Sequence, residues 1–243
     1  MEATQIRRTV EVEDRHWWYR ERRAILAREL RELRRFGVPG RALDIGAAGG
    51  GNTRVLVGHG WDALAADYSE TAVELARARG LQAVHADARD LPLPDTRFDL
   101  VLAFDVLEHI REDREAVREI VRVLRPGGTA LVTVPCDMAL WSAHDVASSH
   151  VRRYTREGLN ALLTGEGLVI DRLWSWNVLL RPVVAWRRKR LTGSDVTEMP
   201  HLVNMGLGAI VMAERYLPVK SLPGVSLIAR AHRPGPAAGH PSR

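Results

Sequence analysis

Short apolar runs alternate with helical stretches along the middle of the chain. The runs read RALDI, WDALAAD, LQAVHAD, FDLVLAFD and TALVTVP, and the intervening segments carry apolar residues at helical spacing. Regular alternation of strand and helix is typical of a parallel sheet with helices on both faces. Two later runs, LVIDRLWSW and VSLIARA, predict a sixth and a seventh strand. The pattern therefore predicts an α/β protein.

A helix is expected ahead of this core. Between residues 18 and 36 the apolar positions Ile25, Leu26, Leu30 and Leu33 are separated by arginines and glutamates, which gives one buried stripe. A glycine- and proline-containing break follows and ends the helix.

The pattern divides the chain into five segments. We expect an N-terminal helical lid over 1–36, a core over 37–176, a helical insertion over 177–219, the last core strand within 220–232, and a disordered tail over 233–243. The tail has three prolines, two glycines and few apolar residues, a composition that does not support a packed structure.

Composition limits the cellular location and the partners that we expect of the protein. The single cysteine, Cys136, excludes an internal disulfide framework, and the start of the chain has no apolar export segment, so we expect a cytoplasmic protein. The apolar stretch over 202–213 is too short to span a bilayer. The formal charge of +5 lies largely in arginine-rich segments that could meet anions or a membrane surface. No nucleic-acid-binding module accompanies the charge, so nucleic acid is not an expected partner.

Aspartates lie at or next to the carboxyl ends of four of the predicted strands. They are Asp44, Asp67, Asp87 and Asp105. Ligands of open parallel sheets bind at the carboxyl ends of the strands, which makes these acids candidates for ligand binding. The alternative is that each caps a helix or stabilises a turn, because aspartate favours both positions.

The glycine-rich stretch LDIGAAGGGNT follows the first strand. Such a turn lets a ligand approach the backbone, but the G-x-G-x-x-G frame of a nicotinamide dinucleotide site fails here: the frame from Gly46 meets Ala48, and the frame from Gly49 ends on Arg54. Nearby carboxylates suit ribose hydroxyls and a positive centre better than a pyrophosphate. The stretch therefore points to S-adenosyl-L-methionine.

Together these motifs resemble those of class I S-adenosylmethionine-dependent methyltransferases. The resemblance rests on LDIGAAGGGNT, Asp67, ADARDLPLPDTRFDLVLAFDVLEHI and RVLRPGGTALVTVP, over roughly residues 40 to 170. HWW near the start and WSAHD…HVRRYT resemble a subgroup of this family. The resemblance implies a Rossmann-like, seven-stranded, mostly parallel sheet with an N-terminal helical lid and a helical insertion before the last strand. Ala48 departs from the family pattern D-x-G-x-G-x-G.

The resemblance also assigns residues to the cofactor. Asp67 would accept hydrogen bonds from the ribose hydroxyls, and Asp87 would meet the adenine amino group. The set implied around the cofactor is Asp44, Gly46, Ala47, Gly50, Asn52, Asp67, Tyr68, Asp87, Ala88, Phe104 and Asp105.

The loop after the fifth strand supplies candidates for chemistry. His150, His144 and His109 are candidate bases because imidazole titrates near neutral pH, and Asp145 could orient one of them. The alternative is that a histidine only caps a helix or bonds a carbonyl. No metal site is predicted. The expected substrate wall consists of Trp141, Asp145, Arg152, Arg153, Tyr154 and Tyr19.

Two other segments keep alternative interpretations. The HWWY segment either covers the cofactor or packs against the sheet edge, and one arginine among Arg20, Arg22 and Arg23 could reach the cofactor carboxylate. The insertion NVLLRPVVAWRRKRL combines apolar and basic residues, which fits a lipid-like substrate or peripheral membrane contact, but equally a helical cap or a homodimer interface.

The sequence thus favours a methyltransferase of a small-molecule substrate, anionic or lipid-like, with O- or N-methylation preferred over C-methylation. Two alternatives from other classes remain. One is a catalytically silent cofactor-binding module, and the other is a nicotinamide oxidoreductase, which the glycine frames disfavour.

Overall fold

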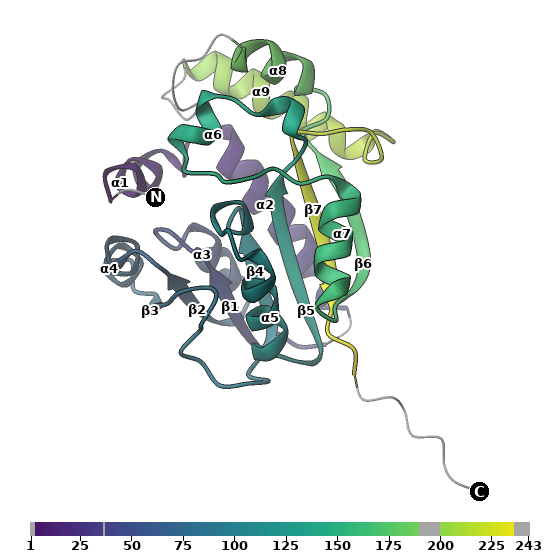
Figure 1. Ribbon diagram of the computed structural model, residues 1–243. Coiled ribbons are helices and arrows are strands. Elements are labelled where there is room, and N and C mark those ends of the chain that lie inside the picture. The colour runs from purple at the N-terminus through teal and green to yellow at the C-terminus, as the bar shows by residue number, and fades with distance from the viewer. Residues whose placement is uncertain (1–2, 36, 190–199, 236–243) are drawn as a thin grey trace, which may run out of the picture.

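A seven-stranded sheet forms the centre of the protein (Figure 1). The computed structural model describes residues 3–35, 37–189 and 200–235. The strand order is β3-β2-β1-β4-β5-β7-β6. The strands are β1 (Arg41–Ile45), β2 (Asp62–Asp67), β3 (Gln82–His85), β4 (Phe98–Phe104), β5 (Leu124–Pro135), β6 (Val169–Trp176) and β7 (Ser226–His232).

The sheet is mostly parallel, as the alternation of elements predicted. The strands β1 to β5 pair in parallel, whereas β7 is antiparallel to both of its neighbours, β5 and β6. β7 follows a long excursion at the carboxyl edge, so it enters the sheet from that edge and runs in the opposite direction. The predicted Rossmann-like fold class is confirmed.

Helices cover both faces because alternate strand residues are apolar on both sides. On one face, Leu100 and Leu102 pack with α2 (Trp17–Leu33) and α3 (Gly51–Gly58). On the other, Val101 and Ala103 pack with α5 (Asp113–Val123) and α7 (Arg156–Gly165). A further helix, α4 (Glu70–Ala78), packs beside β2 and β3.

The N-terminal segment contains two helices. α1 (Ala3–Val12) precedes α2, whose N-cap His16 accepts a hydrogen bond from the Trp18 amide at 3.3 Å. The sequence predicted a helix reaching Phe36, but α2 ends at Leu33.

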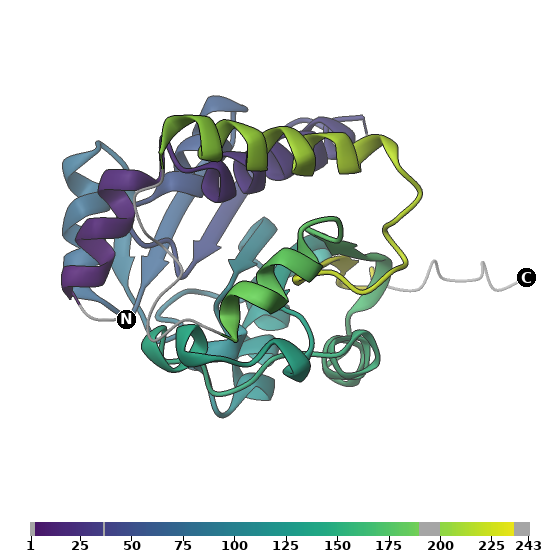
Figure 2. The same ribbon diagram turned by 90° about the horizontal axis from the view of Figure 1, so that it is seen from above.

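The insertion contributes α8 (Arg181–Arg188), α9 (His201–Ala213) and the 3₁₀ turn η3 (Glu214–Tyr216). α9 lies alongside α2 (Figure 2), where the Trp17 amide donates to Asn204 Oδ1 at 2.9 Å and Arg215 pairs with Glu21 at 2.5 Å. Trp17 also belongs to an apolar cluster with Trp174 and Trp176. Trp17 and Trp18, whose ring centre lies 4.5 Å from that of Trp176, therefore pack between the sheet edge and the insertion.

The segment predicted to be disordered starts at Arg233, but this residue is ordered in the structure. Arg233 donates to the carbonyls of Val121, Arg122 and Leu124 at 2.7 to 3.3 Å, so this residue is anchored beside β5. Residues 236–243 lie outside the described residues.

No helix in the described part of the chain combines the length and the apolar character that crossing a membrane requires.

Candidate functional site

A cavity of about 550 Å³ lies at the carboxyl edge of the parallel strands. Four parts of the chain line it: the N-terminal helices, the glycine-rich turn with the end of β4, the loop after β5, and the insertion. Viewed from above, α1 and α9 lie along one side of this edge and α6 (Ala143–Ala147) and α8 along the other (Figure 2). The edge that the sequence identified from its aspartates is therefore the hollowed one.

The glycine-rich turn forms the floor next to β1. Gly46, Ala48 and Gly50 all have positive φ angles, of 67°, 47° and 79°. A Cβ atom at Gly46 would lie 2.5 Å from Val106 Cγ2, so the turn depends on glycine there. Ala48 adopts the left-handed conformation in which the family pattern has glycine, and it therefore stores backbone strain.

Replacing Ala48 with glycine is expected to stabilise the protein by about 0.5 to 1 kcal/mol, because glycine adopts positive φ without a steric penalty. Urea denaturation of the variant and the wild type measures the difference. Ala47→Gly, one residue earlier and outside the positive-φ set, is the matched control and should destabilise. A loss of stability in Ala48→Gly comparable with that of the control would contradict the strain assignment.

Asp67 stabilises this turn from the end of β2. Its Oδ2 accepts the Ala48 amide and its Oδ1 accepts the Ser69 amide, both at 2.9 Å. These two hydrogen bonds are contacts of a turn residue, and they hold the carboxylate in a fixed orientation next to the turn.

Asp44 supports the turn from beneath. It is 1% exposed and accepts a hydrogen bond from Thr53 Oγ1 at 2.7 Å. Burial raises the pKa of the Asp44 carboxyl to about 7, against the opposing effect of the Thr53 hydrogen bond.

At the neighbouring strand end, Asp87 pairs with Arg89 at 2.7 Å. The Arg89 hydrogen bonds lower the pKa of Asp87. Tyr68 is 71% exposed, with its ring 5.8 Å from that of His85.

The predicted cofactor residues separate into two groups. The cavity is lined by Gly46, Ala47, Asn52, Phe104 and Asp105. Beyond its lining, at and beside the ends of β1 to β3, lie Asp44, Gly50, Asp67, Tyr68, Asp87 and Ala88.

Arg22 connects α2 to the ends of β4 and β5. Its guanidinium forms an ion pair with Asp105, donates to Thr133 Oγ1, and lies 5.3 Å from the ring centre of Phe104. Among the three arginines singled out from the sequence, Arg22 and Arg23 line the cavity, whereas Arg20 is exposed.

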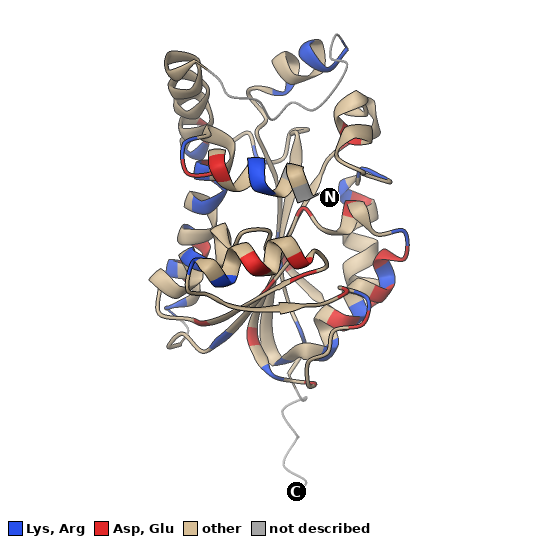
Figure 3. Cartoon of the chain, turned by 90° about the vertical axis from the view of Figure 1, so that its left-hand side faces the viewer, with Lys and Arg blue, Asp and Glu red and all other residues tan. Residues whose placement is uncertain are grey.

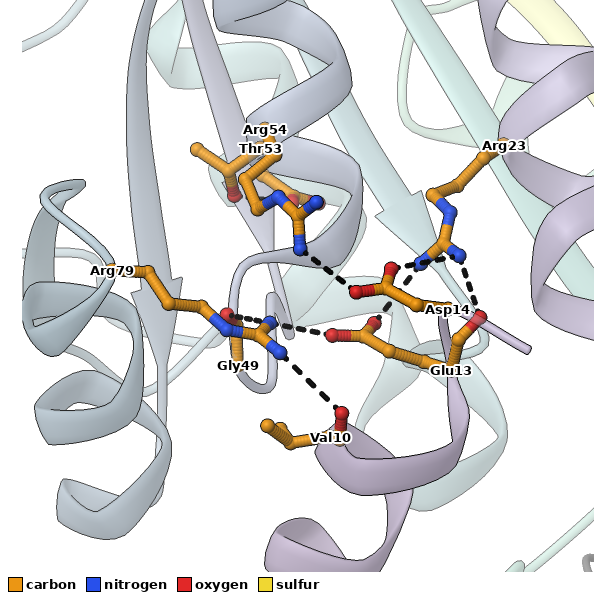
Figure 4. A network of polar contacts seen from close by, with 9 residues as sticks. Val10, Glu13, Asp14, Arg23, Gly49, Thr53, Arg54 and Arg79 are labelled. Carbon is orange, nitrogen blue, oxygen red and sulfur yellow. Dashed lines mark hydrogen bonds and ion pairs between the residues drawn. The ribbon is translucent and has the colours of Figure 1, made fainter. Parts of the chain in front are cut away.

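A polar network attaches the N-terminal segment to the glycine-rich turn (Figure 4). Glu13 pairs with Arg79 at 2.5 Å and with Arg23 at 3.3 Å, and Arg79 also donates to the Gly49 carbonyl at 2.7 Å. Glu13 lines the cavity and was not identified from the sequence, since nothing in its local pattern marks it.

Three histidines gather on the opposite wall. The His109 and His150 rings are 4.9 Å apart between centroids, and the His144 and His150 rings are 6.0 Å apart. All three line the cavity. Burial, with a contribution from His150, lowers the pKa of His109 to about 4.

Asp145 fixes the orientation of this wall. It is fully buried and accepts hydrogen bonds from His150 Nδ1 at 2.9 Å and from Arg153 Nε at 2.8 Å. Burial alone would raise the pKa of the Asp145 carboxyl, but these two partners hold it well below its usual range. Asp145 lies outside the lining of the cavity, and its carboxylate contacts His150 and Arg153.

The wall also contains Glu108, which sequence reasoning passed over in LEHI. Its side chain is buried, and neither carboxylate oxygen has a hydrogen-bond partner on another described residue. Burial, with a contribution from Asp105, raises the pKa of Glu108 well above its usual range. The sequence offered one signal for Glu108: this acid follows two apolar residues and precedes a histidine.

Besides Asp145, three predicted substrate contacts lie outside the lining of the cavity. Arg152 pairs with Asp113 at 2.6 Å, and the Tyr154 hydroxyl donates to Asp113 at 2.8 Å, so both side chains point toward α5. Trp141 follows the turn η2 (Met138–Leu140) and does not reach the cavity either. By contrast, Tyr19 and Arg153 line it.

Comparison with known proteins shows what the middle of the chain is similar to. Residues 43–132 match the family model described as "Methyltransferase domain". A probable S-adenosylmethionine-dependent methyltransferase of Mycobacterium tuberculosis is 36% identical over 110 residues, which are 44% of this chain and 40% of the relative. The demethylmenaquinone methyltransferase of Clavibacter sepedonicus is 38% identical over 97 residues, 38% of this chain and 40% of that protein. The chain thus matches about 40% of the length of these relatives.

A solved structure agrees over most of the chain. The N-methyltransferase NodS of Bradyrhizobium japonicum, solved with S-adenosylhomocysteine, has a TM-score of 0.59 at 19% identity, covering 91% of this chain and 90% of its own. Residues 43–132 thus match a methyltransferase domain, and the likeness to NodS shows the fold.

Proposed function

We propose that this protein transfers the methyl group of S-adenosylmethionine to a small acceptor molecule, at a hydroxyl or amine. The observation that carries the proposal is a single cavity lined both by the glycine-rich turn and by the histidine wall. Its volume of about 550 Å³ is within the usual range of small-molecule sites. Cofactor and acceptor can therefore meet in one cavity.

The cofactor would lie across the glycine-rich turn. The methionine portion would run beside Gly46 and Ala47, and the ribose hydroxyls would donate hydrogen bonds to Asp67. The Asp67 oxygens accept hydrogen bonds from two backbone amides and keep further lone pairs for the hydroxyls. Arg22 neutralises Asp105 near the expected methyl group, which reduces the negative charge at the reacting centre.

The reaction is an in-line displacement in which the positive sulfonium becomes a neutral thioether. Alignment of the two reactants can supply about 7 to 11 kcal/mol of barrier reduction, which exceeds the effect of one proton-transfer residue. The histidine wall would accept the proton of a hydroxyl acceptor, and Asp145 fixes His150 for that role. C-methylation requires a stabilised carbanion and remains the less favoured alternative.

The cavity also favours an acceptor with an anionic group. Arg153, Arg187 and Arg188 line it, and Arg153 Nη2 is buried without a hydrogen-bond partner among the described residues. A carboxylate or phosphate on the acceptor would satisfy that nitrogen.

Incubation with S-adenosylmethionine labelled in the methyl group, and a panel of hydroxyl and amine acceptors with and without a carboxylate, tests the proposal. For a hydroxyl acceptor, His150→Asn should lower turnover by about 100- to 10,000-fold. The control His59→Gln lies at the end of α3, away from the cavity, and should retain activity. Cofactor binding without turnover of any acceptor would instead favour the catalytically silent module.

A second candidate is an acceptor linked to a lipid and methylated at a membrane surface. α9 has no charged residue and α8 has only basic ones (Figure 3). Leu202 is 80% exposed on α9 and Trp186 is 58% exposed on α8. Apolar and basic groups on one face suit an anionic membrane surface.

Co-sedimentation with vesicles tests this second candidate. Wild-type protein should bind vesicles with anionic lipid more strongly than neutral ones, and Leu202→Glu should reduce binding. The control Val38→Glu changes a residue that is 91% exposed ahead of β1, and it should bind like the wild type. Equal loss in both variants would contradict the membrane role. If sedimentation analysis instead shows a dimer that Leu202→Glu dissociates, the exposed residues of α9 would contact a second copy of the chain.

A further inference from the structure

Glu108, His109 and His150 converge at the histidine wall of the cavity. Each offers one ligand atom, and these atoms all lie within 4.8 Å of one another. Glu108 and His109 belong to the 3₁₀ turn η1 (Leu107–His109) after β4, whereas His150 comes from the loop after β5. The fold thus joins residues about 40 positions apart in the sequence into one cluster.

The carboxylate of Glu108 has no evident structural use. The residue is 0% exposed, and its two oxygens lack a hydrogen-bond partner on any other described residue. Burying an unpaired carboxyl group is costly, and buried charges in proteins are normally paired or coordinate metals. The geometry points to a ligand at this position.

We propose that Glu108, His109 and His150 bind one divalent metal ion. Imidazole nitrogens and carboxylate oxygens lie about 2.0 to 2.2 Å from Zn²⁺, so ligand atoms around one ion are separated by roughly 3 to 4 Å. The ligand atoms are at present separated by up to 4.8 Å, and small side-chain rotations would bring them into this range.

The surrounding contacts orient both imidazoles for this role. His150 Nδ1 faces Asp145 Oδ1 at 2.9 Å, and His109 Nδ1 faces the Ser149 carbonyl at 3.4 Å. Metal-binding histidines commonly donate their second ring N–H to a carboxylate or carbonyl, which fixes the tautomer. In both rings Nε2 is therefore the atom assigned to the metal. Arg153 holds Asp145 in turn, at 2.8 Å.

The donor set selects the kind of ion. Two imidazoles and one carboxylate suit Zn²⁺ and other first-row transition metals, whereas Mg²⁺ and Ca²⁺ prefer oxygen ligands. Three protein ligands leave at least one coordination position open, as in catalytic zinc sites. Because all three residues line the cavity, the open position faces the space proposed for the acceptor.

The role of the ion rests on the proposed function and deepens it. An acceptor hydroxyl bound at the open position becomes more acidic and releases its proton to solvent water. The bond between this oxygen and the methyl carbon then forms as the carbon–sulfur bond breaks, and the sulfonium becomes a neutral thioether. With the ion bound, His150 acts as a ligand and does not take up the proton. The implied acceptors are phenols, enols or other hydroxyl compounds.

Titration of chelator-treated protein with Co²⁺ and Zn²⁺ tests the site. We expect one equivalent to bind, with visible Co²⁺ absorption typical of four or five ligands. Glu108→Gln, which keeps the shape of the side chain, and His150→Asn should each weaken binding by at least about 100-fold. The matched control His144→Asn changes a histidine of the same wall outside the three ligands and should bind like the wild type. Thermal unfolding verifies that each variant is folded.

Substoichiometric binding, or variants of Glu108 and His150 that bind like the control, would overturn the proposal. A parallel titration of the metal-free protein with S-adenosylhomocysteine separates this inference from the proposed function. Cofactor binding without metal binding would contradict the metal site alone. Metal binding without cofactor binding would contradict the methyltransferase role and leave the metal site standing.

Discussion

Asp145→Ala is expected to lower the free energy of unfolding by about 3 to 5 kcal/mol, because it leaves the buried Arg153 guanidinium without its carboxylate. The same change removes the acceptor for His150 Nδ1 and for the Ser142 amide, which begins α6. Urea denaturation monitored by tryptophan fluorescence measures the loss. The histidine wall should therefore lose its order together with its stability.

Asp171→Ala is the matched control for this prediction. Asp171 also pairs with a histidine, His232, at 2.7 Å, but both side chains are about one third exposed. Exposed pairs contribute little, so the control should lose less than about 1 kcal/mol. Similar losses in the two variants would contradict the view that Asp145 organises a buried charge cluster.

Asp44→Asn should produce a pH-dependent gain in stability relative to the wild type. The Asp44 pKa is raised from 3.8 to about 7 in the folded protein, so between these values the unfolded chain is ionised while the folded one keeps its proton. The wild type therefore loses stability as pH rises from about 4 to about 7, by about 4 kcal/mol for a shift of about three units. Asparagine does not ionise and can still accept the Thr53 hydrogen bond.

Urea denaturation of both proteins at pH 4, 6 and 8 measures this linkage. The stability difference should move in favour of Asp44→Asn between pH 4 and pH 8 and stay constant above pH 8. A difference that does not change with pH would show that Asp44 ionises normally in the folded protein.

The core could be predicted well because its strands are buried on both faces. RALDI coincides with β1, and the run FDLVLAFD differs from β4 only at its last residue. β5 is longer than predicted because the chain pairs Leu124 with Phe98 before the RPGG segment, through a register irregularity that no local pattern encodes. α1 was not predicted as a separate helix, since Ile6 is its one buried residue among those with described side chains.

The site was predictable where it depends on strand ends and less so where it depends on loops. The histidines were identified as candidates from their residue type and from the position of the loop after β5. The sequence does not reveal the direction of a side chain in an irregular segment, so Arg152 and Tyr154 were assigned to the cavity although they face Asp113. The contacts of Glu108 with the histidines and of Glu13 with Arg79 join distant segments, which local patterns do not encode.

Calorimetric titration with S-adenosylmethionine and S-adenosylhomocysteine, with NADH as the competing cofactor class, tests the central claim most directly. The wild type should bind the first two in the micromolar range and not NADH. Asp67→Ala should weaken binding at least about 100-fold, because two hydrogen bonds to a charged acceptor are lost. Asp62→Ala, at the opposite end of the same strand, should bind normally. Binding of NADH alone, or equal affinity in Asp67→Ala and the wild type, would contradict the account of the cofactor site.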